Sequence, residues 1–146
     1  MKKTILFLGL AIMACGFLAC TSTNELLDIE GNWNTQELVV EEKVFPLCDS
    51  SITIEKSENK NYELNGNSGV NIFFGSAKVK GQSFKVLNNL GSTRMLGDSE
   101  SMEFEKAFTE VLIDARIIKR YSEGEKEFLL LQTKNGKKKI IFARVE

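Results

Sequence analysis

The sequence predicts an α+β domain in which a single curled antiparallel sheet packs against one amphipathic helix. Short segments in which apolar and polar residues alternate recur along the chain, and this pattern is typical of half-buried strands. A strong helical spacing of apolar residues appears once after the first 20 residues. Because the connections between the expected strands are short, neighbouring strands must run antiparallel, and we expect the sheet to curl around the helix.

The expected strands are separated by residues that favour turns. Asn65-Gly66, Lys80-Gly81 and Asn135-Gly136 contain residues that tolerate a positive φ, and Glu123-Gly124-Glu125 supplies a further hairpin turn. Eight strands follow from this pattern, at residues 33–40, 51–55, 62–65, 70–79, 82–87, 116–121, 127–133 and 138–145.

Two of these strands carry residues that should shape the sheet. In the strand at 70–79 we expect Ile72, Phe74 and Ala77 to face one side, with a change of register at Gly75. Trp33 opens the strand at 33–40, and its indole is expected to serve as buried bulk that covers one end of the curled sheet.

One helix is expected at residues 99–114. Asp98 or Ser99 is suited to cap its first turn, and Glu100 and Glu103 lie where the helix dipole favours negative charge. The apolar residues at helical spacing, which should face the sheet, are Phe104, Ala107, Phe108, Val111, Leu112 and Ala115.

The N-terminus has the pattern of a bacterial lipoprotein signal. Lys2 and Lys3 precede an apolar run that ends in small residues and is too short to span a membrane. Phe17-Leu18-Ala19-Cys20 is similar to a lipobox, which predicts a signal peptide at 1–19 and lipidation of Cys20. Cys15 is the alternative, but cleavage there would leave two apolar residues exposed on the mature terminus. Residues 20–28 then form a polar tether.

Composition excludes several classes of function. Without Lys2 and Lys3 the chain has 17 basic and 20 acidic residues, a formal charge of −3, which argues against a nucleic-acid partner. There is no histidine, so Ser-His and Cys-His nucleophiles and His-ligated zinc are excluded. Cys48 is the one thiol of the mature chain besides Cys20, and no two carboxylates can be assigned as an acid–base pair. We therefore expect no enzyme, no metal and no cofactor.

The segment from Gly66 to Arg94 carries the most specific motif. Gly66-Asn67-Ser68-Gly69-Val70-Asn71 runs through a turn into an aromatic strand, and Ser92-Thr93-Arg94-Met95 comes just before the helix. These residues resemble the signature of the META/HslJ family of small bacterial envelope domains. The resemblance implies an open, cracked β-barrel of about eight strands with the helix packed against it, spanning residues 29–146.

The polar residues of the motif are expected to hold the fold together. The amide of Asn71, in an apolar strand, needs partners in the turn, and Arg94 could fix the start of the helix through Glu100 or Glu103. The predicted structural motif comprises Gly66, Gly69, Asn71, Thr93, Arg94 and Met95.

The resemblance also implies a disulfide that this chain lacks. Relatives often have cysteine at the position of Val70 and just after Thr-Arg-Met, where this chain has Leu96 and Gly97. We therefore expect Val70 and Leu96, or their immediate neighbours, to pack together.

Two functions follow as expectations. The first is a lipid-anchored structural or protein-interaction module of the cell envelope, in the outer membrane, with the periplasmic and surface faces both open. The alternative is a carrier that holds an apolar ligand or acyl chain inside the barrel. Small barrels are usually filled by their own side chains, and seven phenylalanines lie in the expected strands and helix, so a filled interior is favoured. These are Phe73, Phe74, Phe84, Phe104, Phe108, Phe128 and Phe142.

Overall fold

The structure is a computed structural model that describes residues 27–146. The predicted signal peptide, the lipidation site Cys20, the alternative Cys15 and most of the predicted tether lie outside the described residues. The elements are β1 (Gly31–Val40), β2 (Lys43–Val44), β3 (Ser51–Lys56), β4 (Tyr62–Asn67), β5 (Ile72–Lys80), β6 (Ser83–Ser92), α1 (Ser99–Asp114), β7 (Ile117–Glu123), β8 (Lys126–Gln132) and β9 (Lys138–Arg144).

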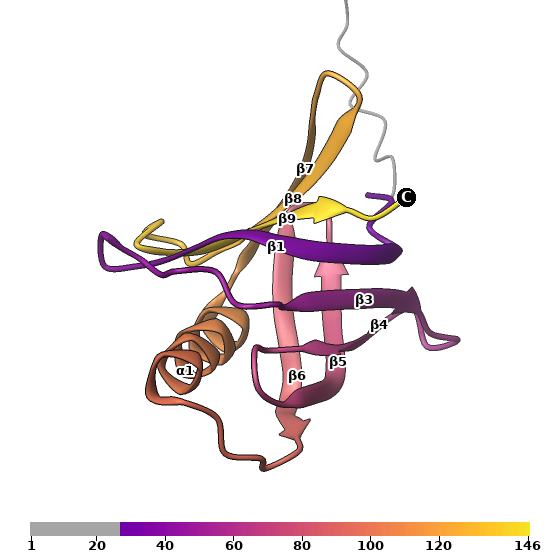
Figure 1. Cartoon of the computed structure of the whole chain (residues 1–146). Helices are drawn as coiled ribbons and strands as arrows, with labels where there is room; N and C mark the ends of the chain where they lie inside the picture. Colours follow the sequence, from indigo (N-terminus) through magenta and orange to yellow (C-terminus); the bar gives the residue numbers. More distant parts are fainter. Residues whose placement is uncertain (1–26) are drawn as a thin grey trace, which may run out of the picture.

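The strands form one antiparallel sheet that closes into a barrel (Figure 1). Each strand from β3 to β9 pairs with the next one along the chain, and β1 pairs with both β3 and β9. Eight strands therefore complete the barrel, and the two-residue strand β2 is an addition that pairs with the end of β1. The predicted class, a barrel of about eight strands with one helix, is confirmed, but the barrel is closed where an open, cracked one was expected. Of the strands, only β2 was not predicted, because a strand of two residues is too short to show alternation of apolar and polar residues.

The barrel has one narrow seam, between β6 and β7. Ser83 and Ile117 are the only paired residues there, and two further main-chain bonds flank them, from Phe84 N to Arg116 O at 3.0 Å and from Ile118 N to Gln82 O at 2.9 Å. Helix α1 is the chain that connects these two strands, and it packs against β1, β6, β8 and β9. The barrel is thus closed by hydrogen bonds all round, and the helix lies against the side where the pairing is thinnest.

Helix α1 has the predicted bounds, Ser99–Asp114. Asp98 is its N-cap, with its side chain accepting a hydrogen bond from Ser101 N at 2.9 Å. This bond lowers the pKa of Asp98, because it stabilises the ionised carboxylate. The six apolar residues predicted to face the sheet are all buried.

The interior of the barrel is filled by aromatic rings. Phe108 lies at the centre, with ring centroids 5.6 Å from Phe73, 6.1 Å from Phe104 and 6.1 Å from Phe142. Phe84 is also buried, so five of the seven phenylalanines predicted to fill the interior do so. Phe74 and Phe128 instead lie on the outer surface, where Phe128 stacks on Tyr121.

The predicted orientation of β5 is wrong. Phe73 and Ala77 point into the core, whereas Ile72 and Phe74 are 58% and 55% exposed. The reason is Asn71, whose buried side chain faces the helix and therefore places the odd-numbered residues inward. The expected change of register near Gly75 is confirmed, because the β5–β6 pairing shifts between Phe74 and Ser76.

Trp33 is buried in the core, as predicted. Its indole is fully buried, and Nε1 donates to Ile29 O at 2.9 Å. The guanidinium of Arg144 lies over the ring, 4.4 Å from its centroid. Glu127 pairs with both Arg120 and Arg144, and the bond from Arg120 is the main reason that the pKa of Glu127 is lowered.

Candidate functional site

The turn at residues 67–71 places the side chain of Asn71 between the barrel and the helix. Gly69 has a φ of +120°, which a side chain would rarely allow, and its N–H donates to Asn67 Oδ1 at 2.9 Å. Ser68 N donates to Asn71 O at 2.9 Å and closes the turn. As a result Asn71 leaves the turn with its amide buried, at 3% exposure, between the barrel and the helix.

The amide of Asn71 uses all of its hydrogen-bonding capacity. Its Nδ2 donates to Glu105 Oε2 at 2.8 Å and to Met95 O at 3.2 Å. Its Oδ1 accepts from Thr93 Oγ1 at 2.9 Å and from Met95 N at 2.6 Å. Two donors and two acceptor lone pairs are all that a carboxamide offers, so the site is fully satisfied.

Glu105 is the partner that the sequence did not reveal. Its Oε1 accepts from Asn71 N at 2.8 Å and from Ser68 Oγ at 2.6 Å. We call Ser68, Asn71, Thr93, Met95 and Glu105 the Asn71 cluster. The signal was present in the sequence, because Glu105 falls three residues before Phe108, on the apolar face of the helix.

Arg94 does not hold the helix start as expected. Its side chain is exposed, and it makes no ion pair or side-chain hydrogen bond with any residue of the described part. The acid that joins the helix to the motif is Glu105, neither Glu100 nor Glu103. Thr93 and Met95 reach Asn71 from either side of Arg94, which leaves Arg94 pointing into solvent.

The remaining motif glycine permits a close approach inside the sheet. A Cβ on Gly66 would lie 2.1 Å from Ser51 O and 2.9 Å from the ring of Phe73. Gly66 therefore allows Phe73 to reach the core across the neighbouring strand, which is a structural role.

The Asn71 cluster fixes the loop at residues 93–98, between β6 and α1. Both main-chain polar groups of Met95 bond to the Asn71 amide. Gly97 lies against Val70, so closely that a Cβ on Gly97 would be 2.7 Å from Val70 Cγ2. The contact expected where relatives have a disulfide thus involves Gly97, the neighbour of Leu96, while Leu96 itself is 93% exposed.

The fixed loop presents apolar side chains to solvent. Leu96 and Met95 are 93% and 56% exposed, and the exposed Arg94 precedes them. In Figure 1 this loop lies at the lower end of the molecule, and the first described residues lie at the opposite end, beside the C-terminus. The loop thus projects from the end of the domain that lies farthest from its N-terminal connection.

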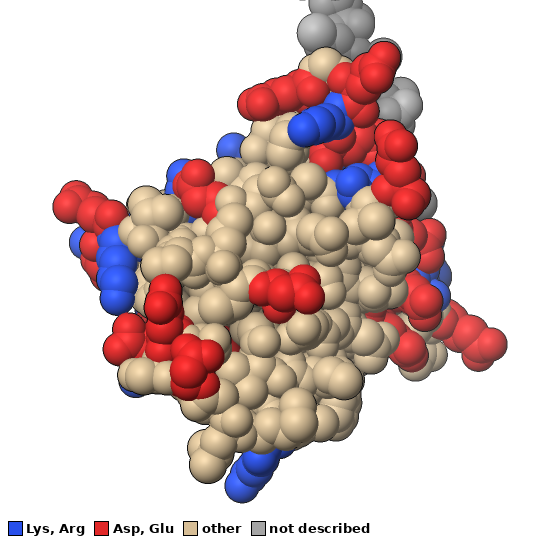
Figure 2. Space-filling model, in the orientation of Figure 1, with Lys and Arg blue, Asp and Glu red and all other residues tan. Residues whose placement is uncertain are grey.

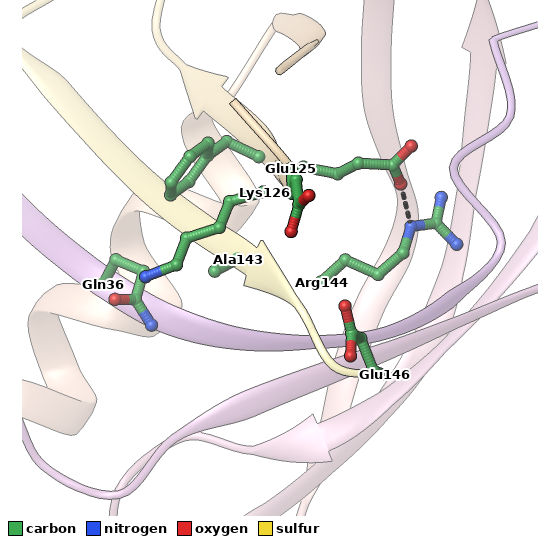
Figure 3. Close-up of a pocket in the computed structure, with 8 residues that line it drawn as sticks. Gln36, Glu125, Lys126, Ala143, Arg144 and Glu146 are labelled. Atoms are coloured by element: carbon green, nitrogen blue, oxygen red, sulfur yellow. Dashed lines mark ion pairs between the residues drawn. The ribbon is translucent and has the colours of Figure 1, made fainter. Parts of the chain in front are cut away.

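Several hollows lie on the outer surface of residues 27–146. The first, of about 540 Å³, is lined by Gln36, Glu125, Lys126, Glu127, Phe128, Ala143, Arg144 and Glu146. Figure 3 shows Lys126 extended toward Gln36 and Arg144 paired with Glu127, 2.5 Å apart. Charges of both signs mix here, and the arginine is already engaged. Within residues 27–146 no three His, Cys, Asp or Glu side chains come together as a metal site, and no helix is long and apolar enough to cross a membrane.

The second hollow is a groove of about 440 Å³ between α1 and β6. Phe73 and Leu90 contribute apolar surface, and Met102 and Ile113 line it from the helix. Glu105, Lys106 and Thr109 also line it, so the groove is mixed in character and open along the helix.

These features define a small closed β-barrel domain whose motif residues build a buried structural cluster and a projecting loop. The chain belongs to the META domain family, whose sequence model matches residues 25–146. The structure is similar to the NMR structure of a protein from Burkholderia xenovorans, at 19% sequence identity and a TM-score of 0.64, over 80% of this chain and 82% of that one. That likeness concerns the fold alone. No curated protein matches the sequence.

Proposed function

We propose that this protein is a lipid-anchored module of the cell envelope that binds a protein partner through the 93–98 loop. The observation that carries the proposal is the combination of exposure and fixation in that loop. Leu96 is almost fully exposed, although Asn71 and Val70 hold the main chain on either side of it. The proposal assigns the protein no catalytic role.

A fixed apolar side chain suits protein binding better than a mobile one. Ordering a loop on association costs about 0.5–1.5 kcal/mol for each immobilised side chain, and pre-organisation removes part of that cost. The Asn71 cluster makes this possible, because two hydrogen bonds with the Asn71 amide fix the main chain of Met95, and two more, with Glu105 and Thr93, hold the amide itself. Exposed apolar side chains grouped on one loop are typical of a contact surface.

The position of the loop suits a partner away from the membrane. A lipid on Cys20 would hold the N-terminal end of the domain toward the bilayer, and we infer an outer-membrane anchor from the signal sequence. The 93–98 loop lies at the other end of the domain (Figure 1). This proposal holds whether the anchored domain faces the periplasm or the cell surface. Fractionation of the cells after crosslinking would show which of the two faces it occupies.

The test is photo-crosslinking in living cells from the full-length chain. A photoreactive amino acid at Leu96 should give one discrete crosslinked protein band, and Leu96→Asp should abolish co-purification of that protein. Val44, which is 64% exposed on the short strand β2, is a matched control for both the crosslinker and the aspartate. Crosslinks from Val44 alone, or an undiminished complex with Leu96→Asp, would overturn the proposal.

The carrier function is the second candidate, and the groove between α1 and β6 is the observation that favours it. Its volume of about 440 Å³ falls within the range of small-molecule sites, and Phe73, Leu90, Met102 and Ile113 give it apolar surface. It is an open side groove, whereas the barrel interior is occupied by phenylalanine rings. Lipid that co-purifies with the wild type at near-equal stoichiometry, and is lost in Ile113→Asp, would favour the carrier.

A further inference from the structure

Eight outward side chains on one face of the barrel form an uncharged patch. Outward side chains of four neighbouring strands form two adjacent rows, in which each residue is paired in register with the next. The first row is Asn32, Thr53, Asn65 and Phe74, and the second is Asn34, Ser51, Asn67 and Ile72. We call these eight residues the neutral face.

The absence of charge is unusual for this chain. Charged residues make up 27% of the sequence, and eight surface positions drawn at that frequency would hold about two of them. Figure 2 shows the result as a broad area over β1 and β3 that has no basic group and one isolated acidic group, with most charges gathered at the edges of the molecule. Half of the neutral face is asparagine, which is rare in strands unless its amide has a partner.

Several of these amides have unused hydrogen-bonding capacity. Asn34 and Asn65 are exposed and make no side-chain hydrogen bond with any residue between 27 and 146. Asn32 Oδ1 accepts from Thr53 Oγ1 at 2.8 Å, which orients the amide and leaves its Nδ2 as a donor. Only Asn67 is turned away, because its Oδ1 accepts from Gly69 N.

An aromatic ring lies at one edge of this face. Phe74 is 55% exposed, and a Cβ on Gly91 of the neighbouring strand would lie 2.2 Å from its Cε2 atom. The ring therefore rests on the backbone of Gly91 with its other side open to solvent. Ile72 beside it is 58% exposed.

We propose that the neutral face binds an uncharged oligosaccharide. A sugar hydroxyl both donates and accepts hydrogen bonds, and a carboxamide offers both within one rigid group. The polarised C–H groups on one side of a sugar ring suit the negative face of an aromatic ring, which Phe74 presents. An anionic ligand would find no basic group here, and contact with the face would remove water from its charge without compensation.

The spacing of the face fits such a chain. Side chains opposite each other on antiparallel strands are about 4.5–5.5 Å apart, close to the length of one sugar unit. The row from Asn32 to Phe74 places four side chains across three such intervals, so a tetrasaccharide could contact an amide, a hydroxyl, a second amide and the ring in turn. This site is separate from the 93–98 loop and does not depend on the function proposed for that loop.

The test is an NMR titration of the full chain in detergent with neutral hexasaccharides, namely chitohexaose, cellohexaose and mannohexaose, and with hexagalacturonate as the charged counterpart. We expect at least one neutral hexasaccharide to bind and to shift the side-chain amide signals of Asn34 and Asn65, with no shift from hexagalacturonate. Phe74→Ala should weaken that binding by about tenfold, the effect of losing one aromatic contact.

Matched variants distinguish the site from a general effect. Asn65→Ala, at an exposed position, should weaken binding without change in the folded spectrum. Phe128→Ala removes an outward ring on β8, two strands beyond Asn34 and outside both rows, and should leave binding unchanged. The proposal is overturned if none of the neutral hexasaccharides binds the folded wild type, if hexagalacturonate binds equally well, or if a protein is crosslinked from position 65 instead.

Discussion

Replacing Asn71 by aspartate tests the Asn71 cluster most sharply, because the substitution keeps the shape of the side chain and changes one donor group into an oxygen. In the wild type Asn71 Nδ2 donates to Glu105 Oε2 at 2.8 Å and to Met95 O at 3.2 Å. In Asn71→Asp an acceptor would face two acceptors, one of them a carboxylate. The variant should therefore be destabilised, by an amount that depends on pH.

The expected loss of stability is set by the less costly of two outcomes, which are repulsion between two ionised carboxylates and protonation of one of them. Two carboxylates 2.8 Å apart would repel by about 6 kcal/mol at an effective dielectric constant near 20. Protonating one carboxyl with an ordinary pKa near 4 costs only about 4 kcal/mol at pH 7. The shared proton then forms a short hydrogen bond that returns about 1 kcal/mol, so the net loss is about 3 kcal/mol.

The sign of the pH dependence follows from the same pair. Folding raises the pKa of the introduced carboxyl, so stability is fully present below its unfolded pKa and is lost as the pH rises through the folded pKa. The deficit relative to the wild type should therefore shrink by about 1.4 kcal/mol per unit between pH 7 and pH 5. Urea denaturation at three pH values measures it. Asn65→Asp, at an exposed position, should stay within about 0.5 kcal/mol of the wild type. A deficit that does not change with pH, or no deficit at pH 7, would refute the reasoning.

Three further predictions concern other parts of the chain. Gly91→Ala should displace the exposed ring of Phe74, whose Cε2 would lie 2.2 Å from the new Cβ, and should destabilise the fold by about 1 kcal/mol or less in chemical denaturation. Cys20→Ala should leave an unprocessed precursor that carries no lipid, and normal processing of this variant would point to Cys15 or to an unlipidated protein. Hydrogen bonds to Glu110 and Asp114 raise the pKa of Lys138 above its ordinary value of 10.5, so this contribution is complete below 10.5 and is lost as the pH rises through the folded pKa. Lys138→Met should remove that part of the alkaline loss of stability in denaturation experiments.

The helix could be predicted in full, because local signals determine it. Asp98 supplies the cap, and the apolar residues from Phe104 onward repeat at helical spacing, so its bounds follow without tertiary information. The strand pattern and the turns at Gly124 and Gly136, both with positive φ, were equally local. Closure of the sheet depends on pairing between β1 and β9, which are far apart in the sequence and leave no local signal. The barrel was therefore predicted from the resemblance to a known family.

The orientation of β5 could not be read from local pattern. Ile72, Phe73 and Phe74 are consecutive large apolar residues, so alternation gives no preferred face. The decision is made by Asn71, whose partner Glu105 is 34 residues away in the sequence. For the same reason the sequence assigned Arg94 a partner among Glu100 and Glu103. The acid that bonds to the motif is instead the half-buried Glu105, and its partner is Asn71.

The position of the missing disulfide explains what the Asn71 cluster does. The resemblance implies a covalent link between the segment around Val70 and the segment after Met95, and a link of that kind is worth about 2–4 kcal/mol. In this chain the same two segments are joined by the contact between Val70 and Gly97 and by the hydrogen bonds from Asn71 to Met95. Neither interaction depends on redox conditions. The 93–98 loop should therefore keep its conformation in a reducing medium, and a partner captured through Leu96 should remain bound when thiol reductant is added.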